Sequence, residues 1–79
     1  MTNDNNEQLK FLEQQLEWSK KQTQLLNEID KKLHEMKGIA EFALEHELSE
    51  MELNDLNDQL AQLKKEVQFL EKQLYTIYH

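Results

Sequence analysis

Histidines with neighbouring carboxylates are the residues of this chain whose types and spacing could bind a metal. His34 and His46 each begin a segment that resembles the H-E-x-x-H motif of zinc proteases, but neither segment contains the second histidine. His46 and Glu50 lie one helical turn apart and would supply two metal ligands, whereas zinc sites normally use three or four. The Glu-x-x-His motif of di-iron bundles is absent from the sequence. We therefore expect no metal-ligating residues and no cofactor.

Nucleophilic chemistry has little support either. The chain has no cysteine and one glycine, so it contains neither a thiolate nor a glycine-rich phosphate loop. Ser19 and Ser49 have no histidine and acid spaced as a nucleophile and its base. We expect no catalytic residues and a non-enzymatic protein. A helical metal-dependent enzyme is the alternative.

Composition limits the classes of partner. The 79 residues carry a net charge of −7 with no arginine, which argues against nucleic acid because phosphate contacts need a basic face. The mean hydropathy is −0.89, and no run of about 20 apolar residues is present, so we expect no membrane association. No apolar signal-peptide segment is visible, and nothing demands an oxidising compartment. These features predict a cytoplasmic protein.

A regular apolar pattern runs through the last third of the chain. Leucine, valine or isoleucine recurs at alternating spacings of three and four residues, the a/d pattern of a coiled-coil helix face. No proline interrupts it. The pattern predicts a helix from about residue 49 to 78. Its core positions are Leu53, Leu56, Leu60, Leu63, Val67, Leu70 and Leu74.

A second pattern precedes the first and is displaced from it by one residue, which indicates two helices rather than one. Ser49 and Glu52 have the spacing of a capping box, so Ser49 is expected to start the second helix. We therefore predict a disordered tail over residues 1–6 and helices over about 7–46 and 49–78. The core positions of the first helix are Leu26, Ile29, Leu33 and Met36.

The short connection between these helices favours an antiparallel hairpin in a single all-α domain over residues 7–79. Folding about residue 47 would place Leu33 near Leu60 and Leu26 near Val67. The alternative is one continuous helix that pairs with itself in parallel, with the polar residues His46 and Ser49 fixing the register.

Charge is concentrated in the middle of the sequence. The segment between Gly38 and Leu63 has no lysine, and its acidic residues equal the whole net charge of −7. A hairpin would gather them at the turn as an acidic tip, which either keeps the protein solvated or binds a basic protein or a cation. The acidic tip consists of Glu41, Glu45, Glu47, Glu50, Glu52, Asp55 and Asp58.

Aromatic residues lie mostly near the chain ends, which an antiparallel hairpin would bring together. Near its N-terminus the first helix carries two apolar stripes, and a single partner helix covers only one of them. We therefore predict a homo-oligomer, most simply a two-fold dimer of hairpins that forms a four-helix bundle. The alternative is that this end binds a helix of another protein. The predicted association surface is Phe11, Trp18, Phe69, Tyr75 and Tyr78.

The middle of the chain also resembles a known family. The motif Leu26-Asn27-Glu28-Ile29 followed by Leu33, Met36-Lys37, Ala40 and Ala43, then Leu48-Ser49, Glu52, Leu56, Leu60, Leu63 and Glu66-Val67, is similar to the N-terminal conserved helical region of bacterial flagellins. The resemblance covers residues 26–67 and implies a hairpin with a break near residues 46–48.

Departures from the flagellin pattern change what the resemblance implies for function. Flagellins have Arg-Glu-Leu-Ala where this chain has residues 37–40, and a small turn residue where it has Glu47. We also find no counterpart of the polymerising segment or the C-terminal helix. The resemblance therefore predicts a flagellin-like accessory or export-associated protein as an alternative function. The first hypothesis is a small bacterial or phage adaptor or structural protein that acts by self-association and protein–protein interaction.

Overall fold

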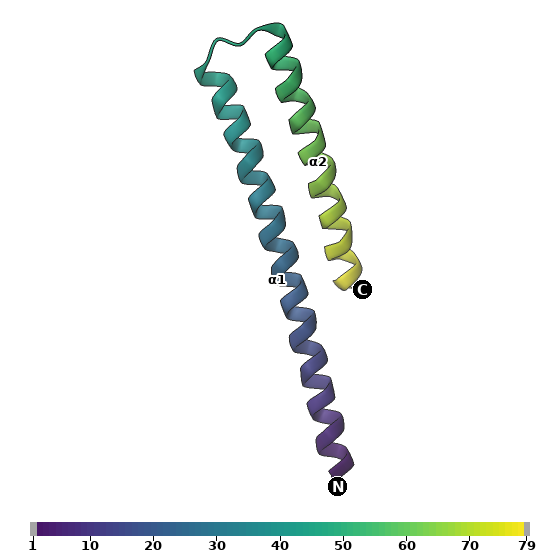
Figure 1. Cartoon of the computed structure of the whole chain (residues 1–79). Helices are drawn as coiled ribbons and strands as arrows, with labels where there is room; N and C mark the ends of the chain where they lie inside the picture. The colour runs from purple at the N-terminus through teal and green to yellow at the C-terminus, as the bar shows by residue number, and fades with distance from the viewer. Residues whose placement is uncertain (1, 79) are drawn as a thin grey trace.

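The protein is an all-α helical hairpin. The structure, a computed structural model, describes the backbone of residues 2–78 and the side chains of residues 5–76. Helix α1 (Thr2–Glu45) and helix α2 (Glu50–Tyr78) are joined by residues 46–49. Figure 1 shows the two helices side by side with opposite chain directions. Residues 2–78 include no strand. The predicted hairpin is confirmed, and a single continuous helix is not what the chain forms.

The helix boundaries differ from the predicted ones mainly at the N-terminus. Helix α1 begins at Thr2, so the structure places residues 2–6 in a helix rather than in the predicted disordered tail. Polarity suggested a tail, but this segment contains no proline or glycine, and polar residues alone do not end a helix. The other ends lie within one residue of the predicted positions.

The predicted capping box forms at the start of α2. The Glu52 backbone N–H donates to Ser49 Oγ at 3.2 Å, and the Ser49 hydroxyl donates to Glu52 Oε1 at 3.0 Å. The Ser49 backbone N–H reaches the same carboxylate oxygen at 3.4 Å. These bonds satisfy amides that the first turn of a helix leaves without partners. No non-glycine residue in the described chain has a positive φ, so the turn accepts Glu47 without needing glycine.

Helix α2 faces α1 with the predicted stripe. Leu63 and Val67 are its most buried members, with 9% and 7% of their surface exposed. Leu53, nearest the turn, is exposed. The other members are half-buried, so the interface is one layer of side chains thick. The half-buried members are Leu56, Leu60, Leu70 and Leu74.

The inward face of α1 is rotated from the predicted one. Ile29 and Met36 lie on it as predicted, but Leu26 and Leu33 are 47% and 48% exposed. The predicted and the observed inward face of α1 both include positions 29, 36 and 43. They differ in the second line of residues, which lies beside these positions along the helix. Packing against α2 uses the line of Leu25 and Lys32 instead. The half-buried residues of α1 are Gln22, Leu25, Ile29, Lys32, Met36, Ile39 and Ala43.

The molecule is a rod of unequal helices. Its principal extents are 72 × 19 × 12 Å, and α1 with 44 residues is much longer than α2 with 29. At 1.5 Å per residue, α1 alone accounts for about 66 Å of that length. Figure 1 shows the N-terminal part of α1 extending well beyond the end of α2. No helix in the described chain carries an apolar stretch that could cross a lipid bilayer.

Candidate interaction surface

The register of the two helices defines how much of α1 is unpaired. The Nζ atom of Lys32 lies 3.6 Å from Glu66 Oε2, so these residues are level with each other. Helix α2 ends twelve residues after Glu66, and the helices are antiparallel, so its end is level with about residue 20 of α1. Residues 2–19 therefore lie beyond the level at which α2 ends. We refer to this segment as the overhang.

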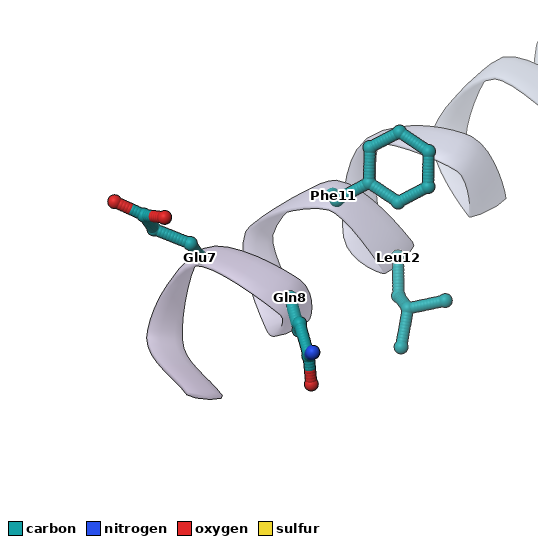
Figure 2. Close-up of a pocket in the computed structure, with 4 residues that line it drawn as sticks. All are labelled: Glu7, Gln8, Phe11 and Leu12. Atoms are coloured by element: carbon teal, nitrogen blue, oxygen red, sulfur yellow. The ribbon is translucent and has the colours of Figure 1, made fainter. Parts of the chain in front are cut away.

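Large apolar side chains are exposed along the overhang. Their exposed fractions range from 56% for Leu9 to 71% for Leu16, with Phe11 and Leu12 between these values. Figure 2 shows Phe11 and Leu12 projecting from different sides of the same turn, beside Glu7 and Gln8 in an open depression of the surface. Apolar surface of this extent on a helix is typical of a face that contacts another helix.

These apolar residues belong to two adjoining stripes, as the sequence predicted. Phe11 and Trp18 continue the inward face of α1, because they precede Leu25 at intervals of seven residues. The second stripe lies beside the first and includes exposed residues of both the overhang and the paired part of α1. We call it the leucine stripe; it consists of Leu9, Leu12, Leu16, Leu26 and Leu33.

Ser19 and Thr23 occupy the centre of the leucine stripe. The Thr23 hydroxyl donates to the Ser19 carbonyl oxygen at 3.0 Å, so that donor is satisfied within the helix. Because of this internal bond, a neighbouring helix could cover the position without leaving the Thr23 hydroxyl unpaired.

The predicted association surface does not form a single cluster. Phe69 and Tyr75 are exposed on α2 away from its inward stripe, whereas Phe11 lies on the overhang. Phe69 is three residues beyond Glu66 and therefore level with about residue 29, roughly 27 Å along the axis from Phe11. Trp18 lies near the end of α2 and is partly exposed. The side chain of Tyr78 is outside the described residues. Phe11 and Phe69 therefore do not share one end of the hairpin, because α1 extends beyond α2, and the association surface itself stays a prediction.

The acidic tip forms at the turn, where the last turns of α1, the connection and the first turns of α2 carry its residues. Glu50 and Glu52 stand in the first turn of α2, where the helix dipole favours negative charge. The last turn of α1 has no basic residue to balance the dipole there. Two exposed apolar residues accompany the acids, Leu44 at 87% and Met51 at 77% exposure.

The histidines take part in local helix contacts. His46 Nδ1 lies 2.9 Å from the Phe42 carbonyl oxygen, and the two rings stack with centroids 4.1 Å apart. His34 Nδ1 lies 2.9 Å from the Asp30 carbonyl oxygen. Within the described part of the chain, no three histidine, aspartate or glutamate side chains gather as a set of metal ligands.

Lys32 is the charged residue of the interface that the sequence analysis missed. It stands on the inward face of α1, and only 23% of its side chain is exposed while it pairs with Glu66. Its aliphatic stem can cover apolar surface while the ammonium group reaches the carboxylate at the edge. Extending the seven-residue series of Phe11, Trp18 and Leu25 by one step would have found it.

The fold and this surface define a helical hairpin whose longer helix extends beyond the shorter one and exposes apolar side chains there. No protein family, curated protein or solved structure matches the chain. Nothing in these comparisons links the chain to flagellins.

Proposed function

We propose that the protein is a non-enzymatic interaction protein that acts by self-association, most simply as a two-fold dimer of hairpins containing four helices. The observation that carries this proposal is the exposed apolar surface of the overhang, which the hairpin itself does not cover. Symmetric homodimers are the commonest soluble oligomers, and a helix with a free apolar face is a ready partner for another helix.

The total exposed area supports the proposal. A compact monomeric protein of 9.5 kDa exposes about 5,000 Å² of surface. This chain exposes 6983 Å². The excess, about 2,000 Å², is larger than the roughly 800 Å² that each partner buries in a standard protein interface. Association would therefore bring the molecule towards the surface-to-mass ratio of a compact protein.

Sedimentation equilibrium over a concentration range from nanomolar to hundreds of micromolar tests the proposal. We expect the mean mass to rise with concentration from 9.5 kDa towards twice that value. A monomer at every concentration would contradict self-association. The overhang, the aromatic residues of α2 and the acidic tip would then be the surfaces for a partner protein.

A second candidate is a flagellin-like accessory or export-associated protein. The observation that favours it is the break at residues 46–49 followed by a helix capped by Ser49, the feature that the flagellin resemblance implies. Under this proposal the leucine stripe binds a helix of a flagellar component. Co-sedimentation with purified flagellar filaments or with unpolymerised flagellin tests this candidate, and the absence of binding to both would contradict it.

A further inference from the structure

We propose that the leucine stripe binds the leucine stripe of a second copy in antiparallel orientation, so that each overhang lies along the partner's hairpin as a third helix. This inference rests on the proposed self-association and specifies its interface and direction. The hairpins of the two copies would point in opposite directions from a two-fold axis near residues 17 and 18.

The position of the stripe on α1 makes room for such a helix. Leu26 and Leu33 each follow a residue of the inward face, Leu25 and Lys32, by one position. One position corresponds to about 100° around an α-helix. A helix that covers the stripe therefore meets α1 beside α2 and does not compete with α2 for the same face. The exposed stripe is thus continuous with the existing interface between α1 and α2.

Charge around the overhang selects the antiparallel direction. Glu13 and Lys20 each follow a position of the leucine stripe, Leu12 and Ser19, by one residue, so both lie along the same edge of the stripe. A parallel, in-register pair sets each of these residues level with its own copy, so like charges are level with like charges. An antiparallel pair centred between residues 17 and 18 brings Glu13 of one copy within about one helical turn of Lys20 of the other. Opposite charges then meet twice, once on each side of the two-fold axis.

The same antiparallel register matches apolar positions. Leu9 of one copy becomes level with Leu26 of the other, and both are exposed in the hairpin alone. Leu12 and Leu16 become level with Thr23 and Ser19, the pair whose hydrogen bond is internal to the helix. Each copy therefore covers the partner's exposed leucine at both ends of the contact, and the Thr23 hydroxyl between them is already satisfied.

The first experiment separates this surface from the other exposed apolar residues. The triple variant Leu9→Gln, Leu12→Gln, Leu16→Gln should raise the dissociation constant of the dimer at least tenfold, measured by sedimentation equilibrium. The control is the double variant Leu44→Gln, Met51→Gln at the acidic tip, where the residues are more exposed and lie outside the stripe. It should change the constant less than twofold. Equal effects of the two variants would overturn the proposal.

Charge reversals test the direction without removing apolar surface. The variants Glu13→Lys and Lys20→Glu should each weaken the dimer severalfold, and the chain that carries both changes should recover most of the affinity. In a parallel dimer each reversal replaces one like-charge contact with another and leaves the affinity nearly unchanged. That result would overturn the antiparallel arrangement, and it remains informative if the leucine variant fails to fold.

A distance measurement gives an independent answer. The chain has no cysteine, so Gln8→Cys provides a single site for a spin label. In the proposed dimer the two labels are about 30 Å apart along the axis, whereas a parallel pair places them about 10 Å apart. A short distance overturns the direction only. A wild-type chain that stays monomeric would overturn the proposed function itself, so the two failures are distinguishable.

Discussion

Burial at single positions separates the leucines that hold the hairpin from those that are free for other contacts. Leu63 lies at the centre of the α1–α2 interface, while Leu44 projects from the last turn of α1 into solvent. The two residues have the same side chain on the same kind of backbone. Any difference in the effect of replacing them therefore reports the local environment.

Replacing Leu63 with alanine should lower the free energy of unfolding by about 2 kcal/mol, the low end for buried leucine, because a one-layer interface can partly close around the space. Leu44→Ala should change it by less than about 0.5 kcal/mol, as expected of an exposed position. Urea unfolding monitored by circular dichroism at low concentration measures both. Equal losses would mean that Leu44 is covered in the molecule that unfolds.

Gly38 is a weak point in α1 that the fold does not require. A Cβ atom built at this position meets nothing within 4 Å, and the glycine has no positive φ. Gly38→Ala should therefore raise the free energy of unfolding by about 0.5 to 1 kcal/mol, because alanine loses less conformational freedom in a helix. A shift of the urea midpoint to higher concentration checks this. A destabilised variant would indicate that another chain approaches Gly38 closely.

At the scale of elements, the turn depends on side chains rather than on a special backbone conformation. Ser49 and Glu52 close the first turn of α2 with reciprocal hydrogen bonds. The Leu53 backbone N–H adds a bond of 2.9 Å to the Ser49 carbonyl oxygen. The cap fixes where α2 begins and therefore sets the length of the connection.

Ser49→Ala should lower the free energy of unfolding by about 1 kcal/mol because it leaves an amide of the first turn without its acceptor. Ser19→Ala is the matched control, since the same change in the middle of α1 removes no cap and replaces serine with a better helix former. The control should be neutral or slightly stabilising in the same urea experiment. Equal destabilisation by both variants would contradict a capping role for Ser49.

The sequence predicted these elements unevenly, and the reasons are physical. The inward face of α2 was predictable because leucines recur there without ambiguity, and the cap was predictable because Ser49 and Glu52 have a diagnostic spacing. The inward face of α1 was not predictable, because Ile29 and Met36 belong equally to two stripes. Only the contact with α2 selects one of them. Lys32 was overlooked because a charged residue does not register in an apolar pattern, although it continues the series of Phe11, Trp18 and Leu25.

At the scale of the whole molecule, the difference in length between α1 and α2 determines the shape. The predicted helices already differed by about ten residues, so an unpaired segment was implied by the sequence, but aromatic residues at both chain ends suggested a shared end. In the structure α2 ends level with about residue 20, so the overhang has intrahelical hydrogen bonds and no support from α2. A segment of about 18 residues is only marginally stable as an isolated helix in water.

The stability of the overhang should therefore depend on protein concentration. Amides of residues 9–16 are expected to exchange with deuterium rapidly at nanomolar concentration, where the chain is monomeric, and to become protected at hundreds of micromolar as a second copy covers them. Amides of residues 60–67 serve as the internal control, because the contact between α1 and α2 protects them at both concentrations. Equal protection of residues 9–16 at all concentrations would mean that the overhang is a stable helix by itself, and association would then have no ordering role. A rise in protection with concentration that is confined to residues 9–16 would show that the part of α1 beyond the end of α2 becomes ordered when the dimer forms.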